Sequence, residues 1–240
     1  MSRGGSPILD RLRSLCPTLS AGVLSADIMK LGEELAALER SGVGMVHVDV
    51  MDGCFCPALT VGPSYVKGLR TPLLKDVHLM IREPLDSLDE YVAAGADMIT
   101  VQLETSIHIH RVLQRLSGVE SINEPGAGIV RGLALCPATP LEWLTEPLLE
   151  EVDVIVLLAV DPGWSGQTFA PATLARLAKV KALVSASGRD ILTAIDGGIT
   201  ADNIGMVADA GPDVIMAGSA VFTGGRTAEN ARTLLAAMAG

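Results

Sequence analysis

The stretch HVDVMDG, residues 47–53, places a histidine and an aspartate two positions apart inside an apolar segment. Because side chains on a strand alternate between its two faces, His47 and Asp49 share one face. Two other apolar segments contain similar residues: His78 lies in DVHLM and Asp196 in AIDGG. Imidazoles combined with carboxylates suit Zn²⁺, Fe²⁺, Mn²⁺ or Co²⁺ better than Ca²⁺ or Mg²⁺, which prefer oxygen ligands. These residues predict a divalent metal site, provided that the fold brings them together.

Glycine-rich turns in the C-terminal half form a second candidate site. DPGWSGQ (161–167), DGG (196–198) and GSA (218–220) each follow an apolar run. Glycines allow backbone N–H groups to approach an anion closely, so a phosphate can be bound without lysine or arginine. The three loops together predict a phosphate site. The alternative is that these glycines only permit tight turns.

The elements that must position these residues alternate along the chain. Between the strand-like runs lie amphipathic segments such as 26–42, which has leucines at helical spacing and ends at Gly42. Apolar runs that predict strands occupy residues 18–24, 44–50, 75–80, 97–103, 128–135, 153–160, 190–196 and 213–219.

Strands that alternate with helices predict a parallel sheet with right-handed crossovers. Eight such units in 240 residues predict one α/β domain over residues 1–240, a (β/α)₈ or TIM barrel, with residues 1–16 as an extension before the first strand. A doubly wound sheet is the alternative, but no G-x-G-x-x-G turn follows the first strand.

A barrel would gather the candidate ligands, because functional side chains meet at the C-terminal ends of its strands. A single histidine in a strand is more often a hydrogen-bonded core residue, and the agreement among three strands is what favours a metal site. His108 and His110 follow the fourth predicted strand at the start of a helix. We expect these two histidines at the surface or beside the site.

Composition restricts the classes of partner. A net charge of −10 with only three Phe, two Tyr and two Trp disfavours nucleic-acid binding. The longest apolar run, 154–160, is far below the roughly 20 residues that cross a bilayer, and the first fifteen residues lack the apolar block of a secretory signal. We therefore expect a soluble, cytoplasmic protein. Without a CxxC pair, the cysteines are predicted to be reduced packing residues: Cys16, Cys54, Cys56 and Cys136.

Several motifs together resemble the ribulose-phosphate 3-epimerase family over roughly residues 18–225. They are LSADIMKLGEEL, HVDVMDGCFCPALTVGPSYVKGLR, DVHLMIREP, YVAAGAD, PATPLE, DPGWSGQTF, DGGIT and AGSAVF, in the family's order and spacing. The resemblance implies a (β/α)₈ fold, one divalent metal ion per chain, and interconversion of D-ribulose 5-phosphate and D-xylulose 5-phosphate. It also implies a small-molecule ketose phosphate as the partner, and a homo-oligomer, either a dimer or a hexamer.

The resemblance implies a role for each matching residue. The metal ligands would be His47, Asp49, His78 and Asp196, with Asp49 and Asp196 also acting as acid and base. Met51 and Met80 would lie against the intermediate. The substrate and its phosphate would contact His78, Gly163, Trp164, Ser165, Gly166, Gly197, Gly198, Gly218 and Ser219. Epimerisation at carbon 3 removes a proton from one face and returns one to the other, so two bases are needed.

Three departures from the family pattern affect the expected substrate. Gly22 stands where the family has a substrate-contacting serine, and Ser20, on the same strand face, is predicted to replace its hydroxyl. Trp164 and Ser165 replace Phe and Gly in the phosphate loop, and Leu158 replaces a methionine. A hexulose 6-phosphate or a tetrulose phosphate is therefore the close alternative.

Two other classes of protein remain as alternatives. A decarboxylase of the orotidine-phosphate type would need a D-x-K-x-x-D run at a strand end, and HVDVMDG has no lysine there. A non-catalytic phosphate-binding barrel is disfavoured by the two-histidine, two-aspartate set.

Overall fold

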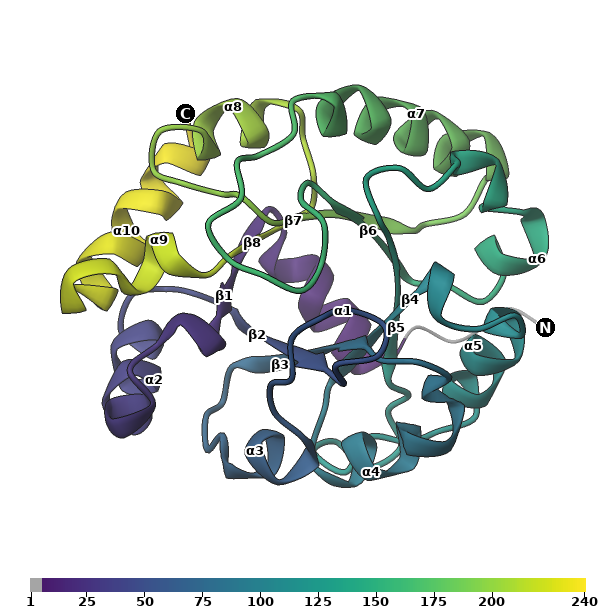
Figure 1. Cartoon of the computed structure of the whole chain (residues 1–240), viewed down its shortest axis with the longest axis horizontal. Helices are drawn as coiled ribbons and strands as arrows, with labels where there is room; N and C mark the ends of the chain where they lie inside the picture. The colour runs from purple at the N-terminus through teal and green to yellow at the C-terminus, as the bar shows by residue number, and fades with distance from the viewer. Residues whose placement is uncertain (1–5) are drawn as a thin grey trace.

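The computed structural model describes residues 6–240, whose strands close into a parallel barrel in the order β1 to β8 (Figure 1). The strands are β1 Thr18–Gly22, β2 Met45–Met51, β3 Leu74–Met80, β4 Met98–Gln102, β5 Val130–Leu135, β6 Val154–Leu158, β7 Leu192–Asp196 and β8 Val214–Ala217. All eight predicted strands are confirmed. Most are shorter than predicted, because the last apolar residues of several runs already belong to turns.

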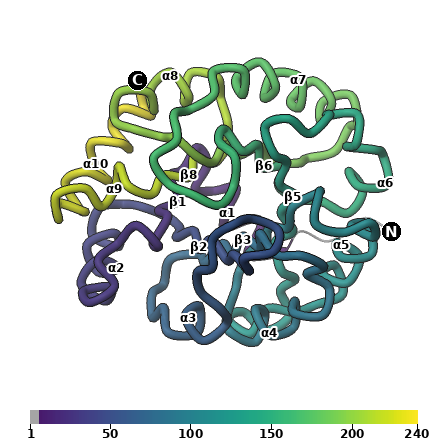
Figure 2. Tube along the Cα trace, viewed as in Figure 1, coloured from purple at the N-terminus to yellow at the C-terminus, as the bar shows by residue number. Residues whose placement is uncertain are grey.

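Helices surround the barrel as a ring, except for the first helix, which lies across the N-terminal end of the barrel (Figure 2). They are α1 Pro7–Leu15, α2 Leu31–Glu39, α3 Pro63–Gly68, α4 Leu88–Ala93, α5 Ile109–Ser117, α6 Glu146–Leu149, α7 Ala172–Ser187, α8 Ile204–Asp209, α9 Ser219–Phe222 and α10 Thr227–Met238. Short 3₁₀ turns are Val23–Ser25, Ile28–Lys30, Pro84–Ser87, Leu103–Thr105, Leu141–Trp143 and Thr223–Gly225.

The predicted helix over 26–42 is shorter in the structure. Asp27 accepts a hydrogen bond from the backbone N–H of Met29 and starts a 3₁₀ turn there, so that the α-helix α2 begins only at Leu31. An aspartate side chain that caps a turn in this way competes with regular helix formation. The segment that follows β1 therefore leaves the barrel through a polar turn.

Strand residues divide between two apolar clusters according to the two-residue period. Outward residues such as Leu19, Val46 and Ile99 pack against the helices. Inward residues such as Met98 and Val156 fill the barrel. The barrel interior is therefore a packed core, and only its mouth is left for polar chemistry.

Helix α1 closes the N-terminal end of the barrel, where Ile8, Leu9 and Leu12 join the inward cluster. Figure 1 shows α1 passing across the barrel behind the strands. It forms the described part of the predicted extension 1–16; residues 1–5 lie outside the described residues. No helix in residues 6–240 is both long and apolar enough to cross a membrane.

Candidate metal centre at the barrel mouth

The register between neighbouring strands gives the position of each inward side chain along the barrel axis, counted from the N-terminal ends of the strands toward the mouth. Gly22 pairs with His47, Asp49 with His78, and Asp196 with Leu158. An eight-stranded barrel of this type shifts its register by about one residue per strand, so inward side chains form layers from alternate strands. Counting upward, the layers are His47, Thr100, Val156 and Met216; then Gly22, His78, Ala134 and Asp196; then Asp49, Gln102, Leu158 and Gly218.

The four predicted ligands converge across these layers. Asp49 Oδ1 lies 3.0 Å from His47 Nε2 and 3.2 Å from His78 Nδ1. Asp196 Oδ2 lies 3.7 Å from the same nitrogen of His47 and 3.8 Å from that of His78. One ligand atom from each of the four residues lies within 4.8 Å of the others. Atoms that each lie about 2.0–2.1 Å from one ion are separated by roughly 3 to 4 Å, so the cluster fits a divalent metal ion.

Asp76 contacts the cluster from the side nearer the N-terminal ends of the strands. It was not predicted as a site residue. Its Oδ2 lies 2.7 Å from His47 Nδ1, and its Oδ1 accepts a hydrogen bond from Thr100 Oγ1 at 2.9 Å. A carboxylate on the far nitrogen of a ligating histidine fixes the ring orientation. The sequence carries a signal for this residue: DVH at 76–78 mirrors HVD at 47–49, and both fall on the inward face.

Opposing charges shift the pKa values at the mouth. Burial disfavours the charged imidazole of His47, but Asp49 and Asp76 outweigh it and raise the pKa of His47 well above its usual value. Burial also disfavours ionised Asp49, yet the His47 and His78 imidazoles hold the pKa of Asp49 well below its ordinary range. Burial raises the pKa of Asp196 to about 6, with Asp49 adding to the shift and the imidazoles opposing it. Such divergence is typical of two carboxylates that share one site.

The glycine-rich loops lie at the same end of the barrel. Gly163 approaches the loop after β2 so closely that a Cβ there would lie 2.5 Å from Pro57 Cδ. Gly198 has a φ of +68°, and a Cβ would lie 2.6 Å from the backbone nitrogen of Phe169. No larger residue fits either position without movement of its neighbours. Gly197 also has a positive φ, and Gly218 leads directly into Ser219, the first residue of α9.

The remaining predicted site residues are placed as follows. Met51 and Met80 end β2 and β3 and pair with each other beside the cluster. Ser20 is fully buried and pairs with Met45 and Met216, which places it in the layer below His47. The hydroxyl of Ser20 has no hydrogen-bond partner among the described residues.

The two other histidines lie outside the cluster. His108 is exposed and precedes α5, and His110 is half-buried in the first turn of that helix. This agrees with the expected surface position.

The cysteines are free thiols in the structure. Burial is the main cause that raises the pKa of Cys16 and that of Cys136 to about 12, which makes both poor nucleophiles. Cys54 and Cys56 both lie in the loop after β2, where Cys56 is buried and Cys54 is exposed. The free thiols agree with the prediction of reduced cysteines, whereas the predicted packing role is wrong for Cys54, because its side chain is exposed.

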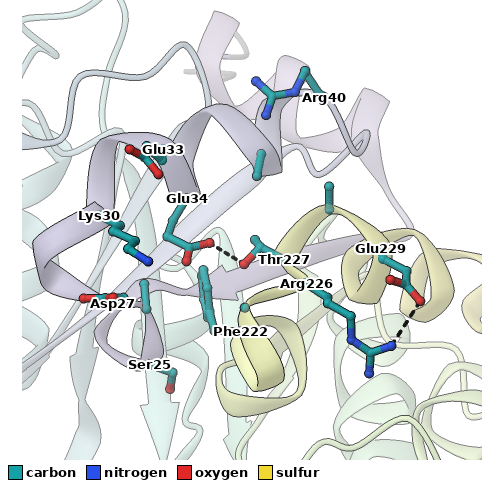
Figure 3. A pocket seen from close by; sticks show the side chains of 14 residues that line it. Ser25, Asp27, Lys30, Glu33, Glu34, Arg40, Phe222, Arg226, Thr227 and Glu229 are labelled. Carbon is teal, nitrogen blue, oxygen red and sulfur yellow. Dashed lines mark hydrogen bonds and ion pairs between the residues drawn. The ribbon is translucent and has the colours of Figure 1, made fainter.

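A separate cavity of about 740 Å³ lies on the flank of the barrel between α2 and α10 (Figure 3). Thr227 Oγ1 donates a hydrogen bond to Glu34 across it, and Arg226 pairs with Glu229 at 3.3 Å. None of the predicted ligand or phosphate residues lines this cavity. This cavity is therefore separate from the candidate metal centre.

Comparison with known proteins gives consistent matches. The profile of the Ribulose-phosphate 3 epimerase family matches residues 18–222. The chain is 41% identical over 210 residues to the ribulose-phosphate 3-epimerase of Escherichia coli strain K12, covering 85% of this chain and 88% of the relative. It is 37% identical over 218 residues to the chloroplastic ribulose-5-phosphate-3-epimerase of Arabidopsis thaliana. The match covers 89% of this chain and 74% of that relative.

Solved structures share the fold at low sequence identity. 3-Hexulose-6-phosphate synthase from Salmonella typhimurium has a TM-score of 0.63 at 18% identity, covering 92% of this chain and 98% of that one. KGPDC from Streptococcus mutans has a TM-score of 0.64 at 17% identity, and the match covers 93% of this chain and 98% of that one. These similarities support the barrel alone.

Proposed function

The chain belongs to the ribulose-phosphate 3-epimerase family, and from this premise we propose that it interconverts D-ribulose 5-phosphate and D-xylulose 5-phosphate at the barrel mouth. It is an isomerase, an epimerase that acts on a sugar phosphate. The observation that carries the proposal is the convergence of two imidazoles and two carboxylates within 4.8 Å at the C-terminal ends of three strands.

Asp49 and Asp196 are the two proton-transfer groups in this proposal. One carboxylate removes the proton from carbon 3, next to the C2 ketone, and the other donates a proton to the opposite face of the resulting planar enediolate. In the reverse direction the two residues exchange roles. They lie on β2 and β7, strands that are not neighbours, and can therefore approach the carbon from different sides.

His47, Asp49, His78 and Asp196 would hold the metal ion. When bound, a divalent ion polarises the C2 carbonyl and the C3 hydroxyl and stabilises the negative charge that develops on their oxygens. Asp76 keeps the His47 ring fixed from below. Met51 and Met80 give the mouth an apolar wall beside the reacting carbons.

The phosphate of the substrate is assigned to the glycine-rich loops. Backbone N–H groups of residues 163–166, Gly197, Gly198, Gly218 and Ser219 are the proposed contacts, and the positive φ of Gly197 and Gly198 supports this. Local amide donors are needed because the protein as a whole carries a charge of −10. The side chains of Trp164 and Ser165 complete the proposed loop.

A related ketose phosphate is the second candidate substrate. Gly22 supports it, because glycine at this position provides no side-chain hydroxyl to contact a substrate, and a Cβ there would lie 3.1 Å from Gly218 Cα. The serine hydroxyl present in the family is therefore missing from the layer of His78 and Asp196. A hexulose 6-phosphate or a tetrulose phosphate is therefore proposed as a substrate that does not need this contact.

The metal, the assembly and the location are further parts of the proposal. We propose Zn²⁺, Fe²⁺, Mn²⁺ or Co²⁺ as the ion, because two of the four donors are imidazoles. Exposed apolar residues on βα loops, namely Ile28, Met29, Leu59 and Ile107, support a homo-oligomer, a dimer or a hexamer. Sedimentation analysis tests the assembly. A cytoplasmic location stays a prediction.

Proton exchange tests the reaction and the substrate together. The protein is loaded with each of the four metals and incubated in deuterated water with ribulose 5-phosphate, a tetrulose phosphate or a hexulose 6-phosphate. We expect deuterium at carbon 3 and formation of the epimer, fastest with ribulose 5-phosphate. Deuterium incorporation into none of the sugars would contradict the function, and a faster reaction with another sugar would favour the second candidate.

A further inference from the structure

Gln102 has an unusual environment at the end of β4. Its side chain is fully buried, and neither its Oε1 nor its Nε2 has a hydrogen-bond partner among residues 6–240. A buried primary amide without a partner is unfavourable, so such a group in a binding cavity indicates a ligand. The proposed metal ligands, acid and base do not use this side chain.

Strand register places Gln102 at the level of the reaction. It pairs with Ala134 on β5 and belongs to the layer of Asp49, Leu158 and Gly218, directly above the layer of His78 and Asp196. Ala134 on the adjacent strand and Leu158 in the same layer have no polar side-chain atoms, and Asp49, the polar side chain in this layer besides Gln102, is bonded to His47 and His78. A polar group of a bound molecule at this level is therefore the remaining partner for the amide.

The position of β4 in the barrel indicates which part of the substrate this is. This step rests on the proposed function. In the eight-strand order, β4 lies opposite β8, the strand that ends at Gly218 in the proposed phosphate loops. The reacting carbons lie between them, at the cluster. A ketose phosphate with its phosphate at β8 therefore directs its other end, the C1 hydroxymethyl group, toward β4.

We propose that Gln102 is a specificity-determining residue whose side-chain amide hydrogen-bonds the C1 hydroxyl of the ketose phosphate. The amide offers an acceptor in Oε1 and a donor in Nε2, and a hydroxyl group can use either. A site that is built to bond a hydroxyl rejects the analogue that lacks it, because the buried amide is then left unpaired. Gln102 thus selects sugars with a free C1 hydroxyl.

The test compares D-xylulose 5-phosphate with 1-deoxy-D-xylulose 5-phosphate, which lacks only the C1 hydroxyl. Deuterium exchange at carbon 3 gives kcat/KM for both compounds in the wild type, in Gln102→Leu and in Gln102→Met. We expect the wild type to prefer the full substrate by at least about tenfold, the value of one hydrogen bond. In both variants the preference should fall to within about threefold, mainly through loss of activity on the full substrate.

Gln114→Leu is the matched control, because Gln114 is exposed on α5. The control should keep the wild-type ratio. A wild type that does not discriminate, or a variant that folds and discriminates as the wild type does, overturns the role of Gln102. Two variants are used in case one does not fold, and the wild-type ratio alone can refute the proposal. If the wild type exchanges carbon 3 in neither sugar, the proposed function itself has failed.

Discussion

Carboxylates lie at both ends of this barrel, but their partners differ. At the N-terminal end, Asp97, Asp153 and Asp213 each precede an even-numbered strand and accept the backbone N–H of the preceding odd-numbered strand, at 2.8, 3.0 and 2.7 Å. At the C-terminal end, Asp49 and Asp196 face imidazoles. The first group joins neighbouring strands, whereas the second surrounds a shared space.

Side chains without partners show the same contrast. At the mouth, buried side-chain atoms of His78 and Gln102 lack a hydrogen bond among the described residues, and deeper in the barrel the Ser20 hydroxyl also lacks one. The carboxylates at the N-terminal end are bonded to main chain and to side chains such as Arg131 and Thr193. Satisfied polar groups stabilise a fold, and unsatisfied ones in a cavity are available to a ligand. Substitutions at the two ends should therefore separate stability from catalysis.

The largest effect on activity is expected at the mouth. Asp49→Asn and Asp196→Asn each remove a base and a metal-ligand charge, so turnover should fall by more than the roughly 10²–10⁴-fold of acid–base catalysis alone. The fold should persist, because neither side chain bonds backbone from another strand. The measurement is kcat with ribulose 5-phosphate, together with the thermal midpoint. Exposed Asp202→Asn is the control, and a variant that keeps a tenth of wild-type activity contradicts the two-base assignment.

The second largest effect is expected on metal content, after substitution of a cluster histidine. His47→Ala or His78→Ala removes one of two imidazoles from a four-residue set, and we expect less than one metal ion per purified chain. Chelation of the wild type should abolish activity, and addition of a suitable divalent ion should restore it. Elemental analysis checks the content, with His108→Ala as the matched control, since His108 is exposed and outside the cluster. Full occupancy in both variants would refute the site.

At the opposite end, the expected loss is in stability. Arg131 is buried and bonds Asp153 through Nε and Nη2 at 2.8 and 2.7 Å. Asp153→Ala removes these bonds and should lower the free energy of unfolding by about 2 to 3 kcal/mol, or the thermal midpoint by roughly 5 to 10 °C. kcat/KM well below the midpoint should stay within about twofold. Equal losses of activity and stability would remove the distinction between the two ends.

The sequence predicted the ligand cluster more completely than its supports. Spacing by two placed His47 and Asp49 on one face, and a barrel brings strand ends together, so the convergence of the four residues followed from pattern and fold. The bond between Asp76 and His47 depends on the register between β2 and β3, which no single strand contains. Gln102 is similar: its burial and its lack of partners depend on β3, β5 and β6. Residues 7–15 became a helix that closes the barrel, a role that only packing reveals.

A smaller effect is expected at Gly22. The new Cβ of Gly22→Ser would lie 3.1 Å from Gly218 Cα, so this backbone must shift by a few tenths of an ångström. We expect the restored hydroxyl to move preference toward ribulose 5-phosphate by about tenfold relative to a tetrulose or hexulose phosphate. Gly22→Ala adds the same Cβ without the hydroxyl and is the matched control. If both variants give the same kcat/KM ratios, the effect is steric and the substrate hydroxyl contact is wrong.

The smallest effect is expected for Trp164→Phe combined with Ser165→Gly. Trp164 is 55% exposed, and the loop is held by Gln167, whose Nε2 donates to the carbonyl oxygens of Asp161 and Trp164 at 2.6 and 3.0 Å. Because these bonds go to backbone, the two substitutions leave them in place. kcat/KM for each ketose phosphate should therefore change by less than about threefold, below the ~1–3 kcal/mol of a reshaped apolar pocket. Gln167→Leu, which removes the bonds, should raise KM more than the double variant does. The opposite order would mean that the Trp164 side chain itself contacts the sugar phosphate.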